Sequence, residues 1–188
     1  MNGNFKGFDK ETNNFLFELQ LCNTNDKQSE NLVMYKKYIT EPINLLYFDL
    51  LEIVNQFDMD FETKPARCIS SLYTDRRFSP NVPLEEYMYL RFRQANRKAN
   101  IIGLYFDMGC DAYGYGLKIY KPNSKDMDLL REKICENVKP CSKLIDDLIL
   151  KGFEITGEKY QKDHFPHIPD SSAKELLNMK CFKSNQEV

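Results

Sequence analysis

One short stretch of this chain limits the fold more than any other. Between residues 87 and 93, the apolar side chains Met88, Leu90 and Phe92 alternate strictly with tyrosines and arginines. Successive side chains of a β-strand point to opposite faces, so this period of two predicts a half-buried strand. The apolar side chains should face a core. The opposite face then carries Tyr87, Tyr89, Arg91 and Arg93.

The neighbouring residues predict a sheet rather than an isolated strand. The run from Ile101 to Met108 alternates again, and Tyr113 to Tyr120 follows after a short, turn-like link. We expect residues 68–74 and residues 153–156 to add further strands. Because short links join neighbouring strands as hairpins, the sheet should be antiparallel, with about four to six strands.

Helical patterns flank these strands. From residue 43 to residue 54, apolar side chains recur every three or four positions, directly after Pro42, which suits the first turn of a helix. Asp9, Ser124 and Ser172 stand where helix caps are expected, and Gly152 stands where a left-handed residue should end a helix. The pattern predicts an α+β fold in one domain, residues 1–188, with a central antiparallel sheet flanked by N-terminal and C-terminal helices.

Composition excludes several classes of protein. With 42% hydrophobic and 29% charged residues, the chain has the composition of an ordinary globular protein, and its net charge of -2 offers no general attraction to nucleic acid or anionic lipid. No stretch approaches the length of a membrane span or has the form of a signal peptide. The six cysteines contain no Cys-x-x-Cys pair, so we expect reduced thiols, no metal, no cofactor and a cytoplasmic location. The oligomeric state stays open.

Two histidines and three glycines give no catalytic motif. His164 and His167 stand among prolines, which favour an irregular loop over a metal-binding helix. Gly109, Gly114 and Gly116 are not followed by the Gly-Lys-Ser/Thr of a phosphate loop. We therefore look for a site among the arginines and tyrosines.

The stretch ISSLYTDRRFS, residues 69–79, resembles the signature of a family of uncharacterised bacterial proteins, domain of unknown function 2461. Similar segments lie in the family's order along most of the chain: FDKETNNFLFEL, YGYGLKIYKP, LLREKI, GFEITGEKY and ELLNMKCF. The resemblance implies an α+β fold and no established activity. The positions that match the family's pattern are Tyr73, Asp75, Arg77, Phe78, Ser79 and Arg131.

The chain also departs from that pattern. Ser71 and Thr74 stand where the family usually has arginines, Pro80 replaces a lysine, and Arg76 is an additional arginine. If the family's polar strand holds an anionic ligand, this chain has lost much of the positive charge that such a site needs.

Asp75, Arg76 and Arg77 form the first candidate site. Paired guanidinium donors suit a carboxylate or phosphate, and a neighbouring carboxylate can hold one of them in place. The alternative is structural, with Asp75 and Arg77 paired at the end of a strand. An enzyme acting on a phosphorylated or carboxylated small molecule would use Asp75 as acid or base. Arg77 and Arg131 would then hold the anion in one concave pocket.

The polar face of residues 87–93 is the second candidate site, and Tyr105 should join it. Rings and arginines together resemble a platform for unpaired bases, but the sequence signature of such domains is missing, so nucleic acid is the less favoured partner. Two alternatives stay open: cross-strand pairs that only stabilise the sheet, and a surface for another protein. We hypothesise a non-catalytic domain that binds an anionic or planar ligand. The candidate residues are Tyr73, Asp75, Arg76, Arg77, Tyr87, Tyr89, Arg91, Arg93 and Arg131.

Overall fold

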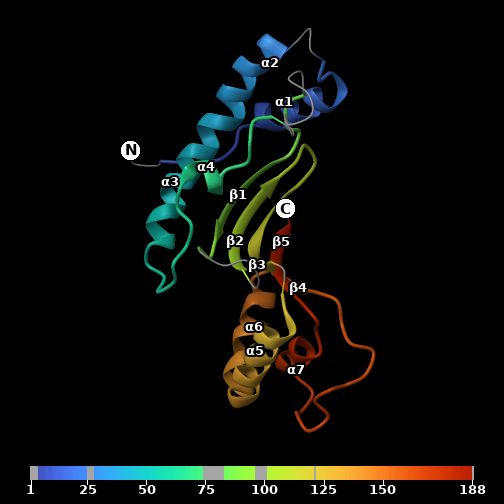
Figure 1. Ribbon diagram of the computed structural model, residues 1–188. Coiled ribbons are helices and arrows are strands. Elements are labelled where there is room, and N and C mark those ends of the chain that lie inside the picture. The colour runs from blue at the N-terminus through green and yellow to red at the C-terminus, as the bar shows by residue number, and fades with distance from the viewer. Residues whose placement is uncertain (1–3, 25–27, 74–82, 96–100, 121, 188) are drawn as a thin grey trace. The chain divides into compact units, whose positions relative to one another are not determined.

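The computed structural model describes the chain except for residues 1–3, 25–27, 74–82, 96–100, 121 and 188 (Figure 1). The helices are α1 (Lys10–Leu21), α2 (Gln28–Tyr35), α3 (Glu41–Val54), α4 (Pro65–Cys68), α5 (Ser124–Glu136), α6 (Val138–Leu150) and α7 (Ser172–Leu177). A π-helical turn, η2 (Lys36–Thr40), joins α2 to α3. The strands are β1 (Met88–Arg93), β2 (Ile101–Met108), β3 (Tyr113–Tyr120), β4 (Glu154–Thr156) and β5 (Lys183–Glu187).

The five strands form an antiparallel sheet in the order β1-β2-β3-β5-β4. The predicted α+β fold, with four to six strands and helices on both sides, is confirmed. The sequence did not predict β5, which lies between β3 and β4 and pairs its Lys183 with Thr156. Its sequence, KSNQE, has no apolar alternation that would predict a strand. The strand is instead formed by backbone hydrogen bonds to its two neighbours, β3 and β4.

The chain divides into two compact units. The first contains Met1–Arg93 and Tyr105–Gly114, and the second contains Gln94–Leu104 and Tyr115–Glu187. One boundary falls at the end of β1, and two fall inside strands, one in β2 and one in β3. That the chain is one domain stays a prediction.

The first unit has a core between α3 and the apolar face of β1. Met88, Leu90 and Phe92 are all buried, so the predicted alternation of β1 is confirmed. The Phe92 ring stacks on the buried ring of Tyr47 from α3, with 5.7 Å between ring centres and 18° between the planes. Burying one aromatic ring of this kind contributes about 1.5–3 kcal/mol. This packing fixes which face of β1 remains polar.

The predicted strand at residues 68–74 is wrong where the structure describes it. Pro65–Cys68 forms the short helix α4 instead, because a proline suits the first turn of a helix. After it, Ile69 and Tyr73 form only single β-bridges, with Leu90 and Leu84 respectively.

Helix caps agree with the sequence in one case and differ by one residue in two. Asp9 caps α1 as predicted. Asn123 caps α5 in place of Ser124, and Ser171 caps α7 in place of Ser172. Each of these caps has extended backbone dihedrals, which a residue inside the helix does not have.

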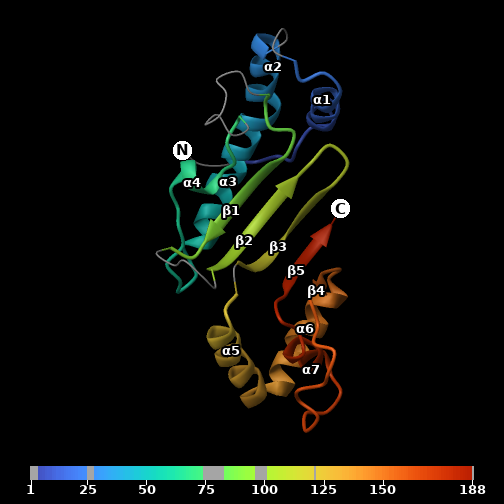
Figure 2. The ribbon, with the colours of Figure 1, turned by 45° about the vertical axis from the view of Figure 1, so that its right-hand side comes forward.

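The second unit is built on α5, α6 and α7, which lie beside one another in Figures 1 and 2. Four buried residues from these helices form the centre of its core: Ile134, Ile145, Ala173 and Leu177. Gly152 follows α6 with a φ of 86°, the left-handed conformation predicted for it. The chain then turns into β4.

Candidate functional site

The polar face of β1 is partly open to solvent. Tyr87, directly before the strand, is 43% exposed, and Arg93, at its end, is exposed. Tyr89 and Arg91, between them, are half-buried. Because the alternate side chains of β1 are buried against α3, these residues point the other way. The structure therefore provides the polar strand face that the sequence predicts.

Arg91 is the centre of this face. Its guanidinium carbon lies 3.8 Å from the centre of the Tyr89 ring, and its Nη2 donates to Asp107 Oδ1 of β2 at 3.1 Å. The side chains of Arg91 and Asp107 are 25% and 24% exposed, so water screens this pair less than a surface pair. The pKa of Tyr87 is raised, chiefly by burial and to a smaller extent by a hydrogen bond with Asp107. The Tyr87 phenol therefore stays protonated beside the ion pair.

Tyr87, Tyr89, Arg91 and Asp107 form a cluster, and the backbone beneath it is held by Ser70, outside the strand. Ser70 N donates to Tyr89 O at 2.9 Å, and Tyr89 N donates to Ser70 Oγ at 3.1 Å. The serine hydroxyl thus takes the place of the carbonyl that a neighbouring strand would supply. As a result, Tyr89 is positioned by its backbone before any ligand binds.

Asp107 is a member of the cluster that the sequence prediction missed. It stands two residues after Tyr105, which was predicted to join this face and is half-buried. Alternate residues of a strand share a face, so the prediction for Tyr105 already implied Asp107. Its carboxylate compensates the charge of Arg91, and the pair adds little net positive charge to the face.

Tyr73 lies on a different segment of the first unit. It is half-buried, its N donates to Ser71 Oγ at 3.2 Å, and it forms a β-bridge with Leu84.

The first candidate site, Asp75, Arg76 and Arg77, lies outside the described residues, as does Thr74. The hypothesis that Asp75 acts as acid or base beside a pair of arginines therefore stays a prediction. Arg131, which that hypothesis also includes, belongs to the described part of the chain.

Arg131 of α5 is buried, with 8% of its surface exposed. Its Nε donates to Leu177 O at 3.3 Å, and its Nη2 donates to Met179 O at 2.9 Å and to Tyr160 Oη at 3.4 Å. Its Nη1 donates to Asp128 Oδ1 at 2.7 Å. All three guanidinium nitrogens therefore have partners, and the side chain attaches the end of α7 to α5. An anionic ligand would have to displace these bonds.

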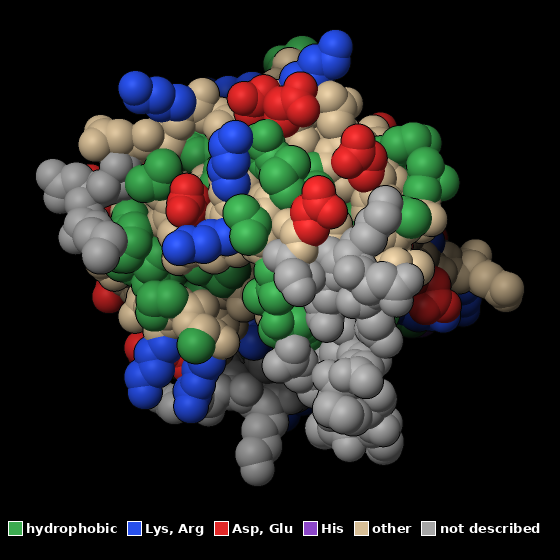
Figure 3. Space-filling view, turned by 90° about the horizontal axis from the view of Figure 1, so that it is seen from above, with side chains coloured by type: hydrophobic (Ala, Val, Ile, Leu, Met, Phe, Trp, Pro, Cys, Tyr) green, Lys and Arg blue, Asp and Glu red, His purple; other side chains and the backbone are tan. Residues whose placement is uncertain are grey.

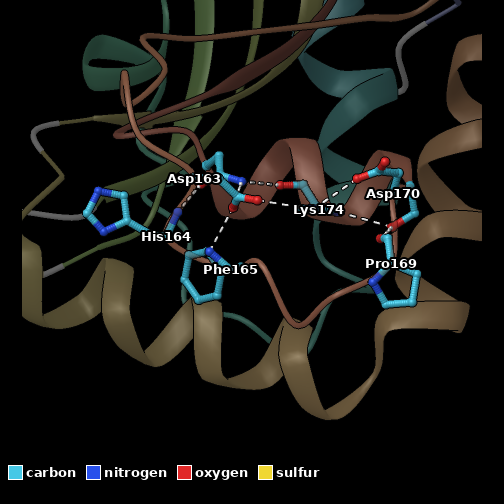
Figure 4. Close-up of polar contacts among 8 residues, drawn as sticks. Asp163, His164, Phe165, Pro169, Asp170 and Lys174 are labelled. Atoms are coloured by element: carbon cyan, nitrogen blue, oxygen red, sulfur yellow. Dashed lines mark hydrogen bonds and ion pairs between the residues drawn. The ribbon is translucent and has the colours of Figure 1, made fainter.

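Lys174 of α7 fixes the loop that precedes its helix. Its Nζ lies 2.9 Å from Asp170 Oδ1 and 3.1 Å from Asp163 Oδ2. Asp163 Oδ1 also accepts from Phe165 N at 2.8 Å and from Asn178 Nδ2 at 3.0 Å (Figure 4). Hydrogen bonds from Phe165, Asn178 and Lys174 lower the pKa of Asp163, while Asp170 and Asp163 raise the pKa of Lys174. The cluster orders the loop through internal partners.

The histidines lie in this same loop, as predicted. His164 N donates to Asn178 Oδ1 at 3.0 Å, and in Figure 4 the His164 ring points away from Lys174. His164 and His167 are both exposed. Among the residues that the structure describes, no group of three or more His, Cys, Asp or Glu side chains could hold a metal ion.

Charges of both signs share the surface. Figure 3 shows one face of the molecule, on which acidic side chains in red and basic side chains in blue lie among hydrophobic side chains in green. This mixture agrees with the small net charge of -2. A charged ligand would thus depend on local side chains rather than on a field from the whole molecule.

A groove of about 430 Å³ runs along α6 in the second unit. Its lining is mainly apolar, with lysines toward the start of α6 and aspartates toward its end. The lining residues are Val138, Lys139, Ser142, Lys143, Asp146, Asp147, Pro169 and Ser171. The sequence prediction included none of them.

Nearly the whole chain matches one known family. The family described as "Conserved hypothetical protein (DUF2461)" matches residues 11–188. The chain belongs to this family. The predicted resemblance of the chain to DUF2461 is therefore confirmed. No curated protein and no solved structure matches the chain.

Membership of DUF2461 brings no known reaction or ligand with it, because the family is itself described as hypothetical. Within the described part of this DUF2461 chain, none of the helices combines the length and the apolar character needed to cross a membrane.

Proposed function

We propose that this DUF2461 protein is a non-catalytic binding domain and that the polar face of β1 takes a planar, anionic ligand. The stack of Arg91 on Tyr89, with 3.8 Å between guanidinium carbon and ring centre, is the observation that carries this proposal. A guanidinium held over a ring and oriented by a carboxylate is a flat group that is already in place for stacking. Such preorganisation reduces the entropy that is lost when a ligand binds.

The spacing along β1 suits a small ligand. Arg91 and Arg93 are two residues apart on one face, which corresponds to about 7 Å along a strand. A planar ring stacked on the guanidinium of Arg91 can direct an acidic group toward Arg93, whose side chain is exposed. Asp107 compensates Arg91 but makes no ion pair with Arg93 in the described structure. Arg93 is thus the residue that we expect to select for negative charge.

Thermal unfolding with three related compounds tests this proposal, because a ligand of the native state raises the melting temperature. AMP has a ring and an anion, adenosine has only the ring, and inorganic phosphate has only the anion. AMP should raise the melting temperature more than either of the others. Benzoate, a planar carboxylate, repeats the test without a phosphate.

Two variants locate the effect on β1. Arg93→Ala should remove most of the shift with AMP and leave the free protein as stable as before, because this side chain is exposed. Lys162→Ala removes an exposed cation of the second unit and should leave the shift unchanged. If neither AMP nor benzoate shifts the wild-type protein, or if Arg93→Ala keeps the full shift, the face only stabilises the sheet and the proposal fails.

A further inference from the structure

Helix α6 carries its charges in the order opposite to the one that a helix favours. Lys139 and Lys143 lie in its first half, and Asp146 and Asp147 lie in its second half. The positive end of the helix dipole is at the N-terminus, so Lys139 in the first turn and Asp147 in the last turn are both unfavourable, and only Lys151 at the C-cap has the favourable sign. This order of charges does not stabilise the isolated helix. It is complementary to a neighbouring helix that presents aspartates beside these lysines and lysines beside these aspartates.

These four charges have no ion-pair partner in the described structure. The ion pairs of the second unit involve other residues of α5, α7 and the loops. Helix α6 therefore offers both signs of charge to an external partner. The apolar groove of about 430 Å³ lies on the same side of the helix.

The end of α6 also carries an apolar side chain without cover. Leu150 is 84% exposed, more than any other large hydrophobic residue of the described chain. At 100° per residue, Leu150 falls on the same side of α6 as Lys139, Lys143 and Asp146. Leu144, which is 62% exposed, falls on a different side. The groove side of α6 thus combines a groove beside residues 138–147 with a projecting leucine at the end of the helix.

We propose that α6 is the interface of a two-fold symmetric dimer, in which a second copy of this chain lays its α6 antiparallel along the groove. In that arrangement Lys143 of each copy lies near Asp146 of the other. Leu150 of each copy enters the other copy's groove beside Val138 and Lys139. Two-fold symmetry makes every contact occur twice, as an interface between identical surfaces requires. Each helix also places its aspartates near the lysine-bearing start of the other, which offsets the unfavourable dipole term.

Sedimentation or light scattering of the full chain over a range of concentrations measures the association. At high concentration, the mass of the wild-type protein in solution should approach twice the 22.2 kDa of one chain. Leu150→Ala should weaken the dimer by about a hundred-fold, since two leucines lose their contacts. Leu144→Ala is the matched control and should leave the dissociation constant unchanged. Because the charge pairs are partly exposed, high salt should also weaken the dimer.

Charge reversal distinguishes the antiparallel pairing from any other association. A variant with Lys139→Glu and Lys143→Glu should be monomeric, and so should one with Asp146→Lys and Asp147→Lys. An equal mixture of the two should associate again, because one α6 is then wholly acidic and the other wholly basic. Circular dichroism checks that each variant is folded. A wild-type protein that stays monomeric, a mixture that does not associate, or an equal effect of Leu144→Ala and Leu150→Ala would overturn the proposal.

Discussion

Asn23 and Leu84 exchange two hydrogen bonds. Asn23 Nδ2 donates to Leu84 O at 2.9 Å, and Leu84 N donates to Asn23 Oδ1 at 3.1 Å. Leu84 is buried, and it also forms the β-bridge with Tyr73. A side-chain amide therefore pairs with the backbone of a buried residue as a neighbouring strand would. This link ties the end of α1 to the segment that leads into β1.

Replacing Asn23 should destabilise the first unit. Asn23→Ala leaves both polar groups of Leu84 without their partner, which should cost about 1–3 kcal/mol in the free energy of unfolding. Asn23→Asp keeps the acceptor but loses the donor, so its effect should be smaller. Urea unfolding measures both. Asn13→Ala, at an exposed position of α1, is the control, and equal midpoints for Asn13→Ala and Asn23→Ala would contradict this role.

Replacing Arg131 should destabilise the second unit. Arg131→Met removes the donors to the carbonyls of Leu177 and Met179, and leaving two buried acceptors unpaired should cost about 2–4 kcal/mol. Arg131→Lys should recover only part of this, because one ammonium cannot reproduce the fork of a guanidinium. Chemical denaturation is the measurement. Arg67→Ala breaks an exposed ion pair and should have little effect. Full stability of Arg131→Met would show that its bonds are not needed.

Gly116 of β3 should tolerate no side chain. A Cβ at this position would lie 1.9 Å from Ser184 O of β5, whereas a Cβ at Gly109 would find its nearest neighbour at 3.5 Å. Gly116→Ala must therefore push two strands apart and should cost about 1–3 kcal/mol or more. Gly109→Ala should be tolerated. Thermal unfolding compares the two, and equal melting temperatures would mean that β3 and β5 do not approach each other this closely.

Asp163 should make the protein sensitive to acid. Its pKa is lowered from the ordinary 3.8 by hydrogen bonds from Phe165, Asn178 and Lys174. A lowered pKa in the folded state stabilises the protein above the ordinary pKa, and this contribution is lost as the pH falls through the folded-state value. The loss of stability should thus begin at about pH 4 and continue below it. Asp163→Asn should flatten the dependence of the melting temperature on pH in this range, whereas Asp58→Asn, at an exposed position of the first unit, should not. An unchanged slope in Asp163→Asn would contradict the assignment.

The sequence alone predicted the features that depend on neighbouring residues. The alternation of Met88, Leu90 and Phe92 defines β1 because a strand presents every second side chain to the same face. The cap at Asp9 and the left-handed Gly152 follow from local backbone preferences. The strand face with Tyr89 and Arg91 was predicted for the same reason.

Only the tertiary structure decided which distant residues meet. Nothing in KSNQE indicates a strand, because β5 exists through pairing with β3 and β4. Asp107 becomes the partner of Arg91, and Leu177 and Met179 become the acceptors of Arg131, because packing brings together segments far apart in the chain. Local patterns are set by backbone geometry over a few residues. Contacts between distant side chains depend on which surfaces are buried together, and a single sequence does not state that.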